Sequence, residues 1–283
     1  MINAVHKIEE VKKQVNEWKK QNLKVGLVPT MGYLHEGHKS LIDRAVKEND
    51  KVVVSVFLNP LQFGENEDLD KYPRDLERDL EVCEKAGANL VFNPEVLEMY
   101  PESSCSYVNV ENLTKGLCGA KRPVHFRGVC TVLTKLFHIV SPDKAYFGEK
   151  DAQQLAVVKK MVKDLNFNLE IVGCPIIREE DGLAKSSRNI YLSKEERKAA
   201  LILNKSLKKA NSLMENGERN AAKLKEIIEN EINSETLAKI DYIEIVDSEN
   251  LEKLDKIEKT VLVAIAVYIG KTRLIDNFTF KLN

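Results

Sequence analysis

Residues 24–38 read KVGLVPTMGYLHEGH, and the organisation of the chain follows from this stretch. Its apolar run over residues 25–28 has the length of a buried strand, and Pro29 lacks the backbone N–H that would continue the hydrogen-bonded ladder. Two glycines then allow the backbone to turn sharply, and apolar residues recur at helical spacing after His38. The stretch therefore predicts a strand, a tight loop and a helix with two histidines at its start.

The predicted helix start is suited to a phosphate group. The first N–H groups of a helix have no partner within the helix, and the helix dipole places partial positive charge there. His35 and His38 can add donors to phosphate oxygens. Two other interpretations stay open: the histidines could cap the helix, or bind zinc, although no nearby Cys or carboxylate pair completes a tetrahedral set. The glycine spacing does not fit the G-x-G-x-x-G fingerprint, and the chain has no P-loop motif.

Composition narrows the class of protein. The chain has 283 residues, enough for two domains, and 43% of them are hydrophobic. The net charge of −1 gives no reason to expect nucleic acid or an anionic membrane as a partner. No stretch is apolar over the roughly 18 residues that a membrane helix needs, and MINAVHKIEE at the start lacks a signal-peptide core. We expect a soluble, cytoplasmic protein.

Cysteine usage also indicates a reducing compartment. The cysteines are odd in number, widely spaced and without a C-x-x-C pair, which argues against a disulfide framework or a zinc site. The five cysteines are Cys83, Cys105, Cys118, Cys130 and Cys174. Each is expected to be a small core side chain.

The first part of the chain alternates strands and helices. VVVSVFL at residues 52–58 is a nearly continuous β-branched run, which is typical of a parallel strand covered on both faces. The other expected strands are residues 24–28, residues 89–94 and the starts of 144–162 and 169–189. The expected helices are 4–20, 38–49, 73–86, a helix from residue 125 and a helix in the later part of 144–162. We predict an α/β fold, with a Rossmann-like parallel sheet domain that has helices on both faces and spans residues 1–177.

The pattern changes after residue 177. Long helical segments come first and apolar strand-like segments follow. The expected helices are 193–215 and 219–232, and the expected strands are 241–247, 259–269 and 272–280. This order predicts a smaller C-terminal α+β domain that spans residues 178–283.

Four blocks carry a resemblance to a known family. HEGH at residues 35–38 is similar to the His-x-Gly-His signature of the nucleotidylyl-transferase superfamily, and with PTMGYL before it the block resembles the pantothenate synthetase (pantoate–β-alanine ligase) family. NPLQFG at 59–64, FGEKDAQQ at 147–154 and KSSRN at 185–189 resemble further blocks of that family in order and spacing. The resemblance continues to KTRLIDN near the end of the chain.

The resemblance implies an activity. Members of that family condense pantoate with β-alanine in an ATP-dependent reaction, which passes through pantoyl adenylate and releases AMP and pyrophosphate. It further implies ATP and Mg²⁺ as requirements, a homodimer, and small-molecule substrates as the partners.

The resemblance also implies a set of site residues. The catalytic residues would be His38, His35 and Lys150, and the residues that hold pantoate or β-alanine would be Gln62, Gln154 and Met31. The ATP-binding residues would be Pro29, Thr30, Met31, Gly32, His35, Gly37, His38, Gly148, Lys150, Asp151, Ile177, Lys185, Ser186, Ser187 and Arg188. Asp79 would hold Mg²⁺ through water. The chain departs from the family pattern at Lys185, where many members carry Met or Leu, and at Arg78, where some members have an acidic residue.

Two other functions stay open. A different enzyme with the same signature could transfer AMP to a phosphate ester, but such a site needs extra basic residues for the acceptor phosphate. The pair Gln62 and Gln154 instead favours an unphosphorylated acceptor. A nucleotide-binding regulatory module would bind ATP without turnover, and it would have no use for two glutamines of the kind that bind substrate.

Overall fold

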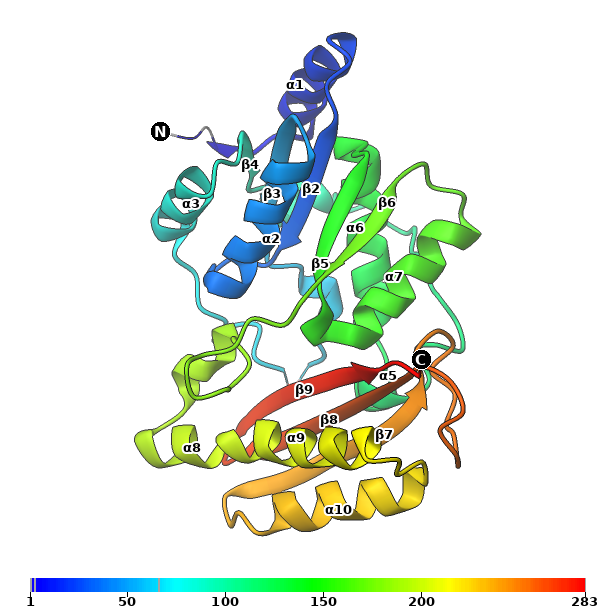
Figure 1. Ribbon diagram of the computed structural model, residues 1–283. Helices are drawn as coiled ribbons and strands as arrows, with labels where there is room; N and C mark the ends of the chain where they lie inside the picture. Colours follow the sequence, from blue (N-terminus) through cyan, green and yellow to red (C-terminus); the bar gives the residue numbers. More distant parts are fainter. Residues whose placement is uncertain (1, 3, 66, 283) are drawn as a thin grey trace. The chain divides into compact units, whose positions relative to one another are not determined.

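The computed structural model describes residue 2, residues 4–65 and residues 67–282 (Figure 1). Contacts between residues divide the chain into two compact units. The first unit contains the chain up to Glu111, Arg122–Glu149 and Val157–Pro175, and the second contains Asn112–Lys121, Lys150–Ala156 and the chain from Ile176 onward. Two short stretches within the predicted first domain therefore pack with the second unit. The predicted boundary after residue 177 stays a prediction.

The first unit is built on a parallel sheet with the strand order β1-β4-β3-β2-β5-β6. The strands are β1 (Ala4–Val5), β2 (Val25–Thr30), β3 (Lys51–Val56), β4 (Leu90–Phe92), β5 (Lys144–Gly148) and β6 (Glu170–Cys174). Each neighbouring pair in this order is parallel. The Rossmann-like sheet that the sequence predicts is therefore confirmed.

Helices cover both faces of this sheet. They are α1 (Ile8–Lys20), α2 (Glu36–Glu48), α3 (Leu76–Lys85) and α6 (His125–Val140). The short helix α4 (Val96–Met99) and the part of α7 (Ala152–Asp164) from Val157 belong to the same unit. On one face, Ile42 and Ala45 of α2 pack with Val28 and Val54 of the sheet. Because successive strand residues point to opposite faces, Leu27 is buried on the other face, where α1 and α6 pack against β2.

Two predictions of local structure in the first unit are wrong. The expected helix over residues 4–20 begins only at Ile8, because Ala4 and Val5 form a strand that pairs with β4. The strand β2 does not end at Pro29 but continues to Thr30. The Thr30 carbonyl accepts a hydrogen bond from Phe57 N–H beside β3, so Pro29 faces β5, whose pairing with β2 has ended at Leu27. At that position the ladder does not require the N–H that proline lacks.

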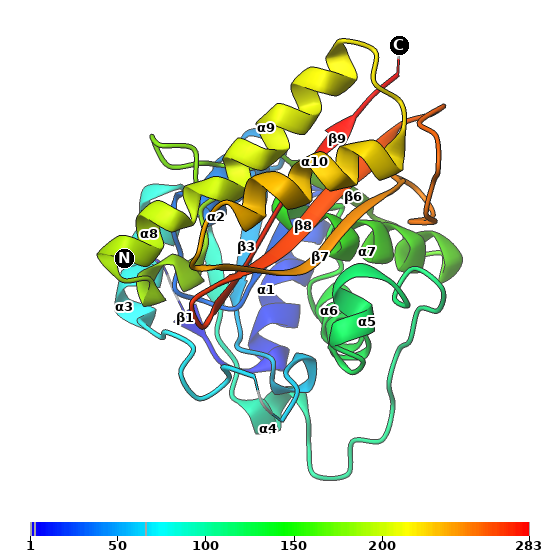
Figure 2. The same ribbon diagram turned by 90° about the horizontal axis from the view of Figure 1, so that it is seen from below.

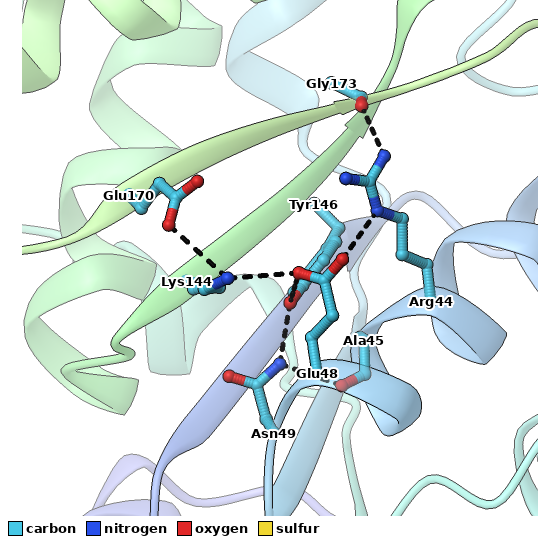
Figure 3. Close-up of polar contacts among 8 residues, drawn as sticks. All are labelled: Arg44, Ala45, Glu48, Asn49, Lys144, Tyr146, Glu170 and Gly173. Carbon is cyan, nitrogen blue, oxygen red and sulfur yellow. Dashed lines mark hydrogen bonds and ion pairs between the residues drawn. The ribbon is translucent and has the colours of Figure 1, made fainter.

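A polar cluster fastens the C-terminal end of α2 to β5 and β6 (Figure 3). Glu48 accepts hydrogen bonds from Arg44 Nε at 2.9 Å, Lys144 Nζ at 3.1 Å and the Tyr146 hydroxyl at 3.0 Å. Arg44 Nη1 also donates to the Gly173 carbonyl at 3.0 Å. The hydrogen bonds from Arg44, Lys144 and Tyr146 lower the pKa of the Glu48 carboxyl to about 2, so the cluster holds an ionised carboxylate at neutral pH.

The second unit is an antiparallel sheet of order β7-β8-β9 with helices on it (Figure 2). The strands are β7 (Ala238–Asp247), β8 (Val261–Ile269) and β9 (Thr272–Phe280). The helices are α5 (Leu117–Lys121), the start of α7 (Ala152–Asp164), α8 (Lys194–Ala199), α9 (Leu201–Glu215) and α10 (Ala221–Asn233). The core of α9 and α10 includes Val263 and Ile265, whereas Leu262 and Ala264 on the opposite face pack with Leu117 of α5.

This arrangement confirms the predicted smaller α+β part of the fold, with two differences in detail. The helix expected over 193–215 is divided into α8 and α9 at Ala200. The short helix α5 was not predicted, because five residues carry too little periodicity to be recognised. Along the part of the chain that the structure describes, none of the helices has both the length and the apolar character needed to cross a membrane.

Candidate active site

The loop after β2 is a tight turn with little room inside it. Thr30 Oγ1 donates to the Ser55 carbonyl at 2.8 Å and accepts from Gly32 N–H at 3.2 Å. Gly32 has φ +88°, a conformation that residues with a side chain rarely adopt, and a Cβ there would lie 3.1 Å from Asp79 Oδ2. The sequence therefore needs glycine at this position to bring the chain from β2 to the start of α2.

The buried side chain of Asp79, from α3, stabilises this turn through two hydrogen bonds. Its Oδ2 accepts from Tyr33 N–H at 2.8 Å and its Oδ1 accepts from Leu34 N–H at 2.6 Å. The residue is 1% exposed, and burial raises the pKa of its carboxyl. Both oxygens accept from backbone N–H groups and the side chain is shielded from solvent, and the role of Asp79 in holding Mg²⁺ through water stays a prediction.

His35 and His38 lie together at the start of α2, as the sequence predicts. Their ring centroids are 4.1 Å apart. His35 Nδ1 accepts from Gly37 N–H at 3.1 Å, and His38 Nδ1 accepts from His35 N–H at 3.3 Å. A neutral imidazole whose Nδ1 accepts a hydrogen bond carries its proton on Nε2. Each ring can therefore cap the helix through Nδ1 and offer Nε2–H as a donor, so capping and anion binding are compatible.

Gln62 and Met31 meet in the first unit. The Gln62 side chain is 7% exposed, and its Nε2 lies 2.9 Å from Met31 Sδ. Its Oε1 accepts from Asn59 Nδ2 at 3.0 Å, and Asn59 Oδ1 in turn accepts from the Tyr100 hydroxyl at 2.8 Å. Asn59 thereby orients the Gln62 amide so that its N–H groups face Met31. A thioether is a weak acceptor, so a carboxylate or hydroxyl of a ligand would be a better partner for this amide.

The backbone of Gln62 is held by the start of α6. His125 Nδ1 donates to the Gln62 carbonyl at 3.0 Å, and Arg122 Nη2 contacts the same carbonyl at 3.3 Å. Gly128 allows this approach, since a Cβ there would lie 2.2 Å from the Leu61 carbonyl oxygen. Reasoning from sequence missed these supporting residues and Asn59. Only the glycine in the first turn of a helix gave a local signal of close approach.

A second group of predicted residues lies in the second unit. Lys150 and Asp151 belong to a short 3-10 turn before α7, with Lys150 Nζ 3.9 Å from Asp151 Oδ2. Of the two glutamines that open α7, Gln153 is buried and donates to the Leu113 and Gly116 carbonyls at 2.9 Å. Gln154 is half-buried. The helix thus directs one glutamine into the core and leaves the predicted pantoate-binding residue, Gln154, more accessible.

The KSSRN block follows a small hairpin in the same unit. Lys185 N–H donates to the Ile177 carbonyl at 2.9 Å, which closes the hairpin. Ser186 then caps the 3-10 helix Ser187–Tyr191 by accepting from Arg188 N–H at 3.3 Å. Ser187 is 7% exposed, whereas Ser186 and Arg188 are half-buried. The residues of the predicted anion-binding loop are therefore the same residues that cap and begin this 3-10 helix.

The predicted site residues are divided between the two compact units. The first-unit group is Pro29, Thr30, Met31, Gly32, His35, Gly37, His38, Gln62 and, at the end of β5, Gly148. The second-unit group is Lys150, Asp151, Gln154, Ile177, Lys185, Ser186, Ser187 and Arg188. Within the described residues, no cluster of three or more His, Cys, Asp or Glu side chains could hold a metal ion.

Comparison with known proteins identifies the family. The family model described as pantoate-beta-alanine ligase matches residues 3–279. The chain belongs to the pantoate–β-alanine ligase family. A pantothenate synthetase of Clostridium novyi is 69% identical over 278 residues, which cover 98% of each chain. A pantothenate synthetase of Enterococcus faecalis is 68% identical over 275 residues, which cover 97% of this chain and 98% of the relative.

Solved structures of this ligase family have the same fold. Pantothenate synthetase from Thermus thermophilus matches with a TM-score of 0.93 at 46% identity, covering 98% of this chain and 99% of that one. Pantoate-beta-alanine ligase from Francisella tularensis, solved in complex with "Beta-gamma ATP and Beta-alanine", matches with a TM-score of 0.83 at 36% identity, covering 98% and 97%. The resemblance found in the sequence is therefore confirmed along nearly the whole chain.

Proposed function

We propose that this pantoate–β-alanine ligase activates pantoate with ATP as pantoyl adenylate, and that His38, His35 and Lys150 are its catalytic residues. Membership of the ligase family supports the overall reaction. The observation that carries the residue assignment is the paired histidine geometry at the start of α2, where both Nδ1 atoms accept from backbone N–H groups and both Nε2 atoms can donate.

In the first step, a pantoate carboxylate oxygen attacks the α-phosphorus of ATP. The new O–P bond forms as the bond to the bridging oxygen of the β-phosphate breaks, and pyrophosphate leaves with that electron pair. In this step a carboxylate approaches a phosphate, and both are negatively charged. Hydrogen-bond donors and cationic groups must therefore offset the repulsion between them and the charge that develops at the α-phosphate. His38, His35 and Lys150 supply them, and one such donor is typically worth about 3 kcal/mol of barrier.

In the second step, the neutral amine of β-alanine attacks the acyl carbon of the adenylate. The C–N bond forms, the C–O bond to AMP breaks, and the amine loses a proton to give the amide. Gln62, Gln154 and Met31 hold pantoate and β-alanine. The buried and oriented amide of Gln62 supports this assignment, because fixed reactants turn a bimolecular attack into an effectively intramolecular one.

The remaining ATP contacts come from backbone turns and from the KSSRN loop. We assign them to Pro29, Thr30, Met31, Gly32, Gly37, Gly148, Asp151, Ile177, Lys185, Ser186, Ser187 and Arg188. Backbone N–H groups at the start of α2 and a planar guanidinium suit phosphate oxygens. Mg²⁺ would arrive with ATP, held by phosphate oxygens and water. Asp79 is the side chain that we propose to contact the ion through water, in addition to accepting from the Tyr33 and Leu34 N–H groups.

We also propose a cytoplasmic homodimer as the working form of the enzyme. The cysteines of the described chain are all in the thiol form, which is compatible with a reducing compartment. The homodimer rests on the family resemblance. Light scattering after size exclusion would give twice the 32.1 kDa chain mass for a dimer, and the single chain mass would contradict it.

A pyrophosphate-release assay tests the reaction. The enzyme is supplied with ATP, Mg²⁺ and pantoate, first without and then with β-alanine. Sustained release only with β-alanine, matched by equal amounts of AMP and pantothenate, is the expected result. Sustained release without pantoate or β-alanine would instead indicate another adenylyl transferase or simple ATP hydrolysis, and ATP binding without release would indicate a regulatory module.

A further inference from the structure

Asp276 and Asn277 are two neighbouring buried polar residues in the middle of β9. They are 2% and 5% exposed. Leu274 and Phe278, two positions either side of Asp276, belong to the core formed with α9 and α10. Because strand side chains alternate, Asp276 shares that face and Asn277 points to the opposite face of the sheet. The side chains of these two neighbouring residues therefore lie on opposite faces of the sheet.

Asp276 holds the hairpin that leads into the KSSRN loop. Its carboxylate forms a bidentate ion pair with Arg178. Arg178 Nη1 donates to Oδ2 at 2.7 Å and Nη2 donates to Oδ1 at 2.9 Å. Arg178 Nη1 also donates to the Gly182 carbonyl at 3.1 Å, across the turn of the hairpin. Arg178 itself bridges to Ala184, directly before the KSSRN block. The buried carboxylate thus determines where this loop begins.

Asn277 holds the turn that carries Lys150. Its Nδ2 donates to the Lys150 carbonyl at 2.8 Å, a contact between residues 127 positions apart in the sequence. The backbone N–H of Asn277 donates to Asp276 Oδ1 at 2.8 Å. This bond links the residue that contacts Lys150 to the residue that contacts Arg178. The Lys150 side chain is 20% exposed, so its ammonium group remains accessible while its backbone is fixed.

We propose that Asp276 and Asn277 are positioning residues that keep the Lys150 turn and the Ser186–Arg188 loop at a fixed spacing, so that both can bind the triphosphate of ATP together. The inference rests on the proposed ATP-binding role of those two segments. A displacement of about 1 Å at such a site can cost about a hundredfold in rate. Buried and mutually bonded polar groups supply the required rigidity.

The test compares two variants with a matched control. Asn277→Ala removes the bond to the Lys150 carbonyl, and Asp276→Asn opposes an amide NH₂ group to the Arg178 guanidinium. Asp241→Asn is the control, because Asp241 lies on the same sheet but its carboxylate pairs with Arg273 and Lys121, and not with Arg178 or the Lys150 carbonyl. We expect each of the two variants to weaken ATP binding about tenfold by titration calorimetry, and the control to bind ATP as the parent enzyme does.

A double-mutant cycle separates positioning from general destabilisation. If Asn277 acts through Lys150, then Asn277→Ala should weaken ATP binding in the parent and have little further effect in Lys150→Ala. The inference would be overturned if the two substitutions reduced the ATP affinity independently, so that their fold-losses multiplied in the double variant. It would also be overturned if folded Asn277→Ala bound ATP as tightly as the parent enzyme does. Unchanged ATP binding by Lys150→Ala would overturn the proposed ATP site itself, and with it this inference. If Asp276→Asn does not fold, the Asn277 cycle alone decides.

Discussion

At the scale of single residues, the loop that presents the histidines depends on one buried carboxylate. Asp79 is far from that loop in the sequence, yet both its oxygens accept N–H groups of Tyr33 and Leu34, directly before His35. A carboxylate whose oxygens both face backbone donors can fix a turn more firmly than a neutral acceptor. Asp79 therefore fixes the backbone that leads into His35 and so positions the proposed catalytic histidines.

Replacing Asp79 by Asn tests this role. The amide would place its NH₂ group against one of the two backbone N–H groups, and two opposed buried donors cost about 1–3 kcal/mol. We expect kcat to fall about tenfold to a hundredfold as the histidines lose their position. Steady-state kinetics and urea unfolding measure the two effects. Asp75→Asn is the control, because Asp75 caps the same helix and Asn is an equally good cap. Parent-like kcat in folded Asp79→Asn would contradict the proposed support.

At the scale of elements, α2 is held at both ends. Its N-terminal end is capped by His35, and its C-terminal end is tied to β5 and β6 by the Glu48 cluster. The helix that carries His38 thus cannot shift along the sheet without breaking polar contacts at one end. Apolar packing of Leu41 and Ile42 fixes its rotation but resists sliding less, because apolar contacts are not directional.

The Glu48 cluster predicts a pH-dependent stability. The folded pKa of Glu48, about 2, is below its usual 4.5, so the contribution is complete above about pH 4.5 and is lost as the pH falls toward 2. The Glu48 side chain is 27% exposed, so we expect Glu48→Gln to lower the free energy of unfolding by no more than about 1 kcal/mol at pH 7.

Urea unfolding of both proteins between pH 7 and pH 3 gives the measurement, and the difference between them should shrink below about pH 4.5. Glu81→Gln, which breaks an exposed pair with Lys85 on α3, is the control and should change the free energy of unfolding by a few tenths of a kcal/mol or less. A difference that stays constant with pH would show that the charge of Glu48 is not what stabilises the cluster.

At the scale of the whole molecule, the proposed ATP-binding residues are divided between two compact units. His35 and His38 belong to the first unit, and Lys150 with Ser186 and Arg188 belong to the second. Each unit has its own sheet and its own apolar core. The proposed contribution of each group to ATP binding can therefore be tested separately, by substituting one residue in each unit.

Thermal unfolding with and without ATP and Mg²⁺ tests these contributions. A ligand at about 100 times its Kd stabilises the folded state by about 2.7 kcal/mol, so we expect ATP to raise the Tm. His38→Ala and Lys150→Ala should each reduce that rise, although they lie in different units. Lys159→Ala, which removes an exposed lysine from α7, is the control and should keep the full rise. A full rise in either site variant would exclude that residue from the ATP site.

The strand β1 and the short helix α5 cannot be predicted from the sequence alone, but most of the order of strands and helices, the parallel character of the first sheet and the family can. These features have local causes: β-branched runs, helical spacing of apolar residues, and short blocks such as HEGH and KSSRN whose residues act as neighbours in the chain. The same local reasoning placed His35 and His38 together at a helix start. It erred at Pro29, because whether a proline ends a strand depends on which neighbouring strand still needs a hydrogen bond there.

The residues that support the site can be identified only once the chain has folded. Asp79 behind Tyr33, Asn59 beside Gln62, and Asn277 on the Lys150 carbonyl are single contacts, and none of them belongs to a repeating pattern. Such a contact leaves no periodic signal in the sequence, because its geometry exists only after two distant segments have packed. Folding stabilises these pairs by burying both partners together, and burial is a property of the packed chain rather than of any stretch of it.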